Sequence, residues 1–310
     1  MIKPYLLHLL ASAAIALLLT NCQEKDILDD NRPNMVKAEL ELGLEPPVLT
    51  RGTTELSPDI ENLIYDIWII QYNSSGILLS GGTAHYRTDV EAGSQKVNQE
   101  IKLVESANST VCIIANLHRS NGNAVYNWPD NLLTYKRTTI DLTSQILSAA
   151  TGTLKSTPMS GYWIGSVTEG TRINASIGRM LTRLNVTLTN TTANNLENIT
   201  VDLKNVPIKS YCYPQINGAA LSNTDYLEDT TPLSNSISLL APSESTTLYY
   251  YIAPNVCDND ALVTSLEITA NDKAVNGSVI LGNDAPGKAN RDFTLYANNI
   301  YNFTINLTAK

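Results

Sequence analysis

Histidine, phenylalanine and charged residues are all scarce in this chain of 310 residues. It contains 3 His and 2 Phe, and only 16% of its residues are charged, below the quarter that is usual in soluble proteins. The formal net charge of −9 argues against a nucleic-acid partner, because phosphate binding needs clustered Lys and Arg. With 43% hydrophobic residues, the chain is nevertheless too apolar for intrinsic disorder.

Motifs that carry catalysis or bind metals are missing as well. The sequence has no Walker loop, no HExxH, no CxxC, no GxSxG and no Gly-rich dinucleotide fingerprint. His85 and His118 stand alone in loop-like sequence, and Asp258-Asn259-Asp260 lacks the Gly and the bidentate Glu of a calcium loop. We therefore expect neither enzymatic activity, nor a metal site, nor a cofactor.

The first 22 residues are typical of a lipoprotein signal peptide. Lys3 gives a positive start, and the apolar run Leu6–Leu19 is too short to cross about 30 Å of hydrocarbon comfortably. The run ends in Leu19-Thr20-Asn21-Cys22, which resembles a bacterial lipobox, in which the Cys is acylated and the signal is cut. An ordinary secretory signal with an incidental Cys is the alternative.

From this we expect a signal peptide at residues 1–21 and a lipid on Cys22 that anchors the mature chain in the outer membrane. Residues 22–36 are polar and acidic, so we interpret them as a flexible tether. Cys112 lies in an apolar run and is predicted to be a small buried residue. Cys212 and Cys257 could pair in an oxidising compartment, but their spacing leaves this open.

Most of the remaining chain alternates between apolar and polar residues, which indicates β-strands. Ala38, Leu40, Leu42 and Leu44 alternate with Glu39, Glu41 and Gly43. The run 66–72 is followed by the turn Asn73-Ser74-Ser75-Gly76 and by residues 77–79, which predicts a hairpin. Similar alternation occurs at residues 97–103, 184–188, 199–203, 266–270 and 301–308, and residues 248–252 form a Tyr-rich strand. One apolar and one polar face is typical of an antiparallel sandwich.

Only residues 141–150 suggest a helix, and a short one. Gly165–Arg172 is interpreted as a linker between two strand-rich halves. We therefore expect an N-terminal β-sandwich domain at residues 37–168, of which residues 37–45 are the first strand, and a C-terminal β-sandwich domain at residues 169–310.

Several short segments form a collinear pattern from about residue 60 to residue 310. They are 66–76, Val111–Asn116, Pro158-Met159-Ser160-Gly161, 177–186, Asn205-Val206-Pro207, 250–255, Arg291-Asp292-Phe293 and Tyr301–Thr304. In this order they resemble the fimbrillin-like lipoproteins of Bacteroidetes. The resemblance implies two transthyretin-like antiparallel β-sandwich domains in tandem, and a subunit of type V fimbriae on the cell surface.

The resemblance also implies assembly by donor-strand exchange. In that family an Arg-specific protease removes the first strand, and a strand from another fimbrial subunit fills the groove. Arg51, followed by Gly52, lies shortly after the alternating strand and is the expected processing site; an Arg in a surface loop is the alternative. Ala38, Leu40, Leu42 and Leu44 are then the groove-filling residues of the replaceable strand.

The chain stops at Lys310 without a further donor segment, so we expect a tip or minor subunit. An anchor that keeps its lipid and first strand is the close rival. The expected partners are other fimbrial subunits, the outer membrane through the lipid on Cys22, and a host protein or glycan. A surface glycan-binding lipoprotein, with Trp128 as an accessible aromatic residue, is the alternative from another functional class.

Overall fold

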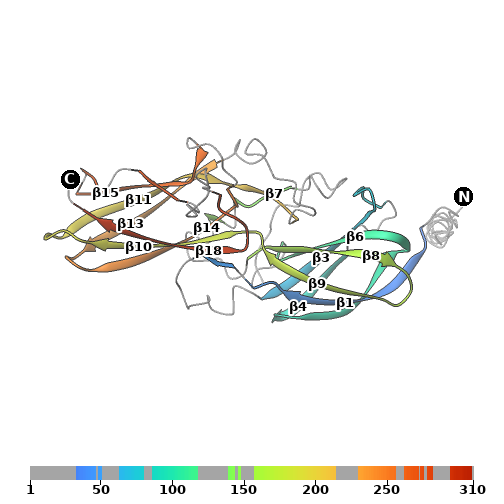
Figure 1. Cartoon of the computed structure of the whole chain (residues 1–310). Helices are drawn as coiled ribbons and strands as arrows, with labels where there is room; N and C mark the ends of the chain where they lie inside the picture. Colours follow the sequence, from blue (N-terminus) through green and yellow to red (C-terminus); the bar gives the residue numbers. More distant parts are fainter. Residues whose placement is uncertain are drawn as a thin grey trace, which may run out of the picture. The chain divides into compact units, whose positions relative to one another are not determined.

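The computed structural model describes residues 33–46, 48–50, 63–79, 86–117, 139–143, 146–147, 157–213, 230–255, 262–271, 273–275, 278–281 and 294–308. These residues are arranged almost entirely in β-strands (Figure 1), and the strands belong to one compact unit that begins at Asn34. The expectation of an all-β sandwich fold is therefore confirmed. In the part of the chain that the model describes, no helix is long and apolar enough to cross a membrane.

The first sandwich is built from a seven-stranded sheet with the order β4-β3-β6-β8-β9-β1-β5. Its strands are β1 (Met35–Leu44), β3 (Ile64–Asn73), β4 (Tyr86–Ser94), β5 (Val97–Val104), β6 (Ser106–Ala115), β8 (Met159–Val167) and β9 (Thr171–Arg179). Strands β8 and β9 pair only at Met159↔Arg179 and Ser160↔Gly178. The two halves of the sheet therefore meet at this short seam and enclose one core, to which β1, β3, β5, β6, β8 and β9 all contribute buried apolar residues.

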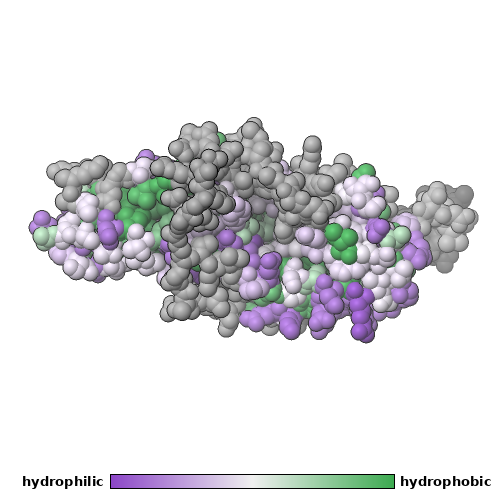
Figure 2. Space-filling view, in the orientation of Figure 1, coloured by the Kyte–Doolittle hydropathy of each residue, from purple (hydrophilic) through white to green (hydrophobic). Residues whose placement is uncertain are grey.

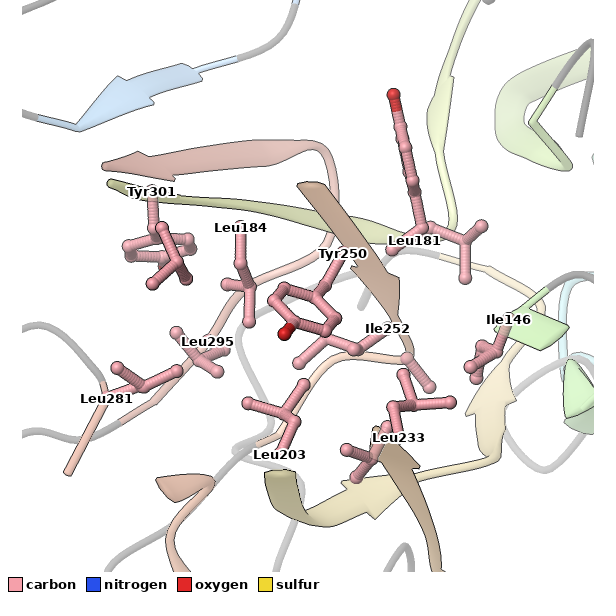
Figure 3. Close-up of a cluster of buried hydrophobic side chains, with 14 of the residues drawn as sticks. Ile146, Leu181, Leu184, Leu203, Leu233, Tyr250, Ile252, Leu281, Leu295 and Tyr301 are labelled. Atoms are coloured by element: carbon pink, nitrogen blue, oxygen red, sulfur yellow. The ribbon is translucent and has the colours of Figure 1, made fainter. Parts of the chain in front are cut away.

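The second sandwich has a four-stranded sheet, β14-β10-β18-β2, and a second sheet in which β13-β11-β15-β16 follow one another and β17 pairs with β15. Its strands are β2 (Val48–Thr50), β10 (Thr182–Asn190), β11 (Leu196–Pro207), β13 (Thr230–Leu240), β14 (Ser245–Ile252), β15 (Ser265–Ala270), β16 (Lys273–Ala274), β17 (Val279–Ile280) and β18 (Asn299–Leu307). Figure 3 shows its core, where Leu184 and Tyr250 of one sheet point toward Leu203 and Leu233 of the other. Two short strands, β7 (Thr139–Asp141) and β12 (Lys209–Tyr211), pair separately.

Most of β3 and the second half of β6, Val111–Ala115, are buried on both faces, which fits the runs of apolar residues in these stretches. Ile69 lies in the core of the first sandwich, whereas its neighbour Ile70 lies in the second apolar cluster. Tyr72 also belongs to that second cluster, and its ring contacts the edge of the Tyr213 ring at a centroid distance of 6.2 Å.

The hairpin predicted after β3 is confirmed. Asn73 Oδ1 accepts hydrogen bonds from the backbone N–H groups of Ser75 (2.9 Å) and Ile77 (3.0 Å). Gly76 has φ 74°, a left-handed conformation that glycine adopts without a steric penalty. Of the helix predicted at residues 141–150, the described Thr143, Ile146 and Leu147 are helical, whereas Asp141 ends β7 and Leu142 is neither helix nor strand. Asp141 caps the helical residues by accepting from the Thr143 N–H at 2.8 Å.

The linker expected at Gly165–Arg172 is wrong. These residues lie at the end of β8, in the turn that follows and at the start of β9. Gly170, with φ 76°, sits in that turn and donates its N–H to the Lys37 carbonyl at 2.8 Å. The polar, Gly-containing composition therefore marks a turn within a sheet. Because β9 pairs with β8 and β1, the first sandwich extends to Arg179 rather than ending at residue 168.

Candidate functional site

Strand β1 is an inner strand of the sheet of the first sandwich and lies between β9 and the edge strand β5. It pairs antiparallel with β5, from Met35↔Val104 to Leu42↔Val97. On its other side it pairs parallel with β9, from Ala38↔Thr171 to Leu44↔Ile177. Both of its backbone edges are thus used, and its absence would leave two unpaired strand edges facing one another.

The side chains that β1 turns inward fill the core of the first sandwich. Ala38 and Leu40 are 1% exposed and Leu42 is fully buried, while Leu44 is half-buried and packs against the same cluster. Val36, which the sequence interpretation did not include, is buried as well. Burial of each leucine stabilises the fold by about 1.5–3 kcal/mol, so these side chains hold β1 in the sandwich.

The outward side chains of β1 are charged and exposed. Lys37 Nζ lies 2.9 Å from a Glu100 carboxylate oxygen, and Arg172 Nε lies 3.1 Å from Glu39 Oε2. The hydrogen bond to Glu100 and the charge of that carboxylate raise the pKa of Lys37. Figure 2 shows hydrophilic residues gathered along the side of the molecule where β1 and β9 lie in Figure 1. Such exposed pairs are screened by solvent and contribute little stability each; together with the buried face they fix the register.

The chain that follows β1 continues into the second sandwich. Glu45 donates its N–H to the Ile177 carbonyl (2.8 Å), and Asn298 Nδ2 donates to the Pro46 carbonyl (3.2 Å). Strand β2 then pairs parallel with β18, from Val48↔Asn299 to Thr50↔Tyr301. The sequence interpretation missed β2, because three residues after Pro46-Pro47 carry no alternation. One segment, residues 35–50, therefore completes sheets in both sandwiches.

Arg51 and Gly52, the predicted processing site, directly follow Thr50 but lie outside the described residues, as does the predicted lipidation site Cys22. The same holds for Trp128, on which the glycan-binding alternative depends, and for a set of other candidates: His85, His118, Cys257 and Asp258-Asn259-Asp260. Within the residues whose placement is described, no group of His, Cys, Asp or Glu side chains is arranged to hold a metal ion.

Cys112 is fully buried on β6, as predicted, and burial raises the pKa of its thiol well above the usual value. Cys212 is buried in the same apolar cluster. A neutral buried thiol packs as a small apolar side chain. The cluster around Cys112 thus contributes to the core rather than to chemistry.

Gly161, in the Met159-Ser160-Gly161 segment, lies at a close approach of the β8 and β9 backbones. A Cβ atom placed on it would lie 2.1 Å from the Ser176 carbonyl oxygen and 3.1 Å from Ile177 Cγ2. Because a backbone oxygen cannot swing away like a flexible side chain, only glycine fits here without moving a strand.

We expect Gly161→Ala to lower the free energy of unfolding by about 1–3 kcal/mol, the usual penalty for overpacking. Gly43→Ala on β1 is the matched control, since a Cβ there meets no atom within 4 Å, and it should be neutral or slightly stabilising. Urea unfolding followed by circular dichroism measures both. Equal effects of the two substitutions would contradict the close approach at the seam.

Comparisons with known proteins find similar folds among solved structures only. No protein-family model matches the sequence, and no curated protein matches it. Among solved structures, the tip fimbrial protein Mfa3 of Porphyromonas gingivalis, with a C-terminal truncation, is similar at a TM-score of 0.57 and 12% identity, over 89% of this chain and 96% of that one.

Two further solved structures agree. A candidate cell adhesion protein of Parabacteroides distasonis has a TM-score of 0.56 at 14% identity, over 89% of this chain and 91% of that one. A candidate cell adhesion protein of Bacteroides eggerthii has a TM-score of 0.52 at 12% identity, over 89% and 88% of the two chains. The protein therefore has a fimbrillin-like fold, as the sequence resemblance predicted.

Proposed function

We propose that this protein is a structural and adhesive subunit of surface fimbriae that receives a strand from a neighbouring subunit. The observation that carries the proposal is the position of β1, which is paired on both edges and buried on one face, yet belongs to the N-terminal segment that precedes Arg51. A cut after Arg51 would separate this segment from every other strand of both sandwiches.

Removal of residues 35–50 would leave an acceptor with defined chemistry. The edges of β5 and β9 would present free N–H and C=O groups along an apolar groove, and β18 would lose its pairing at Asn299–Tyr301. A strand with alternating apolar residues restores the backbone hydrogen bonds and fills the apolar groove. The hydrogen bonds give affinity, and the alternate side chains give register. The pairing and burial of β1 therefore support the proposal of strand exchange.

The proposal includes export as an outer-membrane lipoprotein with acyl chains on Cys22. The lipid and β1 lie on the same side of Arg51 in the sequence, so one cut would both free the fold from the membrane and open the groove. A tip or minor position in the fimbria is proposed, and the name of the similar Porphyromonas gingivalis structure, a tip fimbrial protein, supports it. An anchor would instead keep its lipid and β1.

The test is treatment of the lipoprotein with an Arg-specific protease, followed by mass spectrometry and addition of a labelled peptide with the sequence of residues 35–50. We expect a cut after Arg51 and uptake of the peptide into a band that survives on a native gel. Arg51→Lys, which keeps the charge but is not a substrate for such a protease, should stay uncut and take up no peptide. Cleavage at Arg51 without uptake would refute strand exchange, and efficient uptake by the uncut Arg51→Lys chain would refute the processing step.

A further inference from the structure

A polar side chain, Gln99 of β5, lies in the groove that β1 fills. Gln99 lies directly opposite Leu40 in the β1–β5 register. It occupies the inward-facing positions of β5 together with Val97, Ile101 and Leu103, which are all buried apolar residues. On the other edge of β1, Leu40 is opposite Ile173.

The amide nitrogen of Gln99 is buried and, among the described residues, has no hydrogen-bond partner. A second glutamine of the same sandwich shows the usual arrangement. Gln71 Nε2 donates to the Val104 carbonyl (2.7 Å) and to Ser109 Oγ (2.9 Å), and Gln71 Oε1 accepts from the Val104 N–H (2.8 Å). Since buried polar groups are almost always paired, the Gln99 amide is an exception that needs an explanation.

Leu40 cannot satisfy that amide, because its side chain carries no acceptor. Directly opposite residues of an antiparallel pair have Cβ atoms about 4.5–5.5 Å apart, so a longer polar side chain at the Leu40 position would reach Gln99 Nε2. With β1 in place, the Gln99 amide nitrogen therefore lacks a hydrogen bond. A strand with a polar residue at the position of Leu40 could supply it.

We propose that Gln99 selects the incoming strand: the donor carries an oxygen acceptor, such as Asn, Gln, Ser or Thr, at the position of Leu40, between apolar residues at the positions of Ala38 and Leu42. This inference rests on the proposed function. The hydrogen bond would favour the incoming strand over β1, because only the incoming strand pairs with the amide nitrogen of Gln99. It would also fix the register of that strand.

The test is a four-way cycle with isosteric changes. Acceptors are the protease-cut protein and its Gln99→Met variant, and the probes are labelled peptides of residues 35–50 carrying Leu40→Gln or Leu40→Met. The ratio of Gln-peptide to Met-peptide affinity should be about tenfold higher on the Gln99 acceptor than on the Gln99→Met acceptor, as expected for one buried hydrogen bond and the amide it satisfies. Equal ratios on the two acceptors would overturn the proposal.

The same four combinations made in the uncut chain separate this inference from the proposed function. There, the unfolding equilibrium constants of Leu40→Gln, Leu40→Met, Gln99→Met and the double variants should show the same coupling of about tenfold. Coupling in the uncut chain without peptide binding would uphold the pairing of Gln99 with position 40 and refute strand acceptance. Peptide binding without coupling in either format would uphold strand acceptance and refute the role of Gln99.

Discussion

Replacing Leu42 by aspartate is expected to expel β1 from the first sandwich and to lower the free energy of unfolding by about 4 kcal/mol or more, in the range of an uncompensated buried charge. Leu42 has no exposed surface, and its register neighbours are Val97 on β5 and Ala175 on β9. A carboxylate there would lose its hydration and gain no cationic partner from these two residues.

Glu41→Asp is the matched control, because it places the same aspartate one position earlier, on the exposed face of β1. It should change the free energy of unfolding by less than about 0.5 kcal/mol. Urea unfolding gives the two values, and hydrogen exchange locates the change. Exchange should accelerate in residues 35–44 and along β5 and β9, and much less in β10.

The same variant tests whether β1 is replaceable. If the sandwich persists without it, the Leu42→Asp chain should take up a wild-type peptide of residues 35–50 without any proteolysis, since its own strand no longer competes for the groove. Cooperative unfolding of β3, β6 and β8 together with β1 would instead show that β1 cannot leave while the fold remains. A loss of stability no greater than that of Glu41→Asp would show that Leu42 does not anchor the strand.

The burial of β1 could be predicted from the sequence because it is a local property. Alternation of Ala38, Leu40 and Leu42 with charged residues decides which face is buried, whatever the neighbouring strands are. The neighbours themselves were not predictable. Strand β5 follows far along the chain and β9 farther still, and no pattern in β1 specifies a parallel partner at Thr171–Ile177.

Two errors of interpretation have the same origin. Gly165–Arg172 has a turn-like composition, which is the same for a turn within a sheet and for a linker between domains, and only the pairing of β9 with β1 decides between them. Strand β2 was missed because its three residues have no period to detect and owe their strand conformation to β18. In both places non-local hydrogen bonding overrides the local signal.

At the candidate site, too, part of the arrangement could be predicted from the sequence and part could not. The sequence places Gln99 among the apolar residues of one face. It does not show that, among the described residues, the amide nitrogen of Gln99 lacks a partner while the amide of Gln71 makes three hydrogen bonds. That difference depends on the backbone of Val104 in β5 and the Ser109 hydroxyl in β6 meeting Gln71 of β3. The processing site at Arg51 and the lipid on Cys22 remain predictions from sequence motifs.

Asn116 joins three parts of the first sandwich that do not include β1. The residue is fully buried, with φ 63°, at the end of β6. Its Oδ1 accepts from the Tyr65 N–H at 2.8 Å, and its Nδ2 donates to the carbonyls of Leu63 at 2.9 Å and Thr157 at 2.8 Å. The entry to β3 and the approach to β8 are therefore held against β6 by one side chain.

Asn116→Ala is expected to lower the free energy of unfolding by about 3–5 kcal/mol, because it leaves three backbone groups without their partner and adds the penalty of a left-handed alanine. Asn116→Gly removes the same hydrogen bonds without the backbone strain, so it should be less harmful than Asn116→Ala by about 1 kcal/mol. Urea unfolding of the two variants separates the contributions. A loss below about 1 kcal/mol in both would contradict the bridging role of this side chain.

The effect should be larger after proteolysis at Arg51 than before it. In the uncut chain β1 pairs with β5 and β9 and adds its own buried leucines, so the sandwich has other stabilising contacts. In the cut chain the sandwich must keep the groove open without β1, and the three hydrogen bonds of Asn116 are among the contacts that do not depend on β1. Protease-treated Asn116→Ala should therefore aggregate or unfold where the treated wild type still accepts a peptide; equal peptide uptake by both would mean that the open acceptor is held together by other contacts.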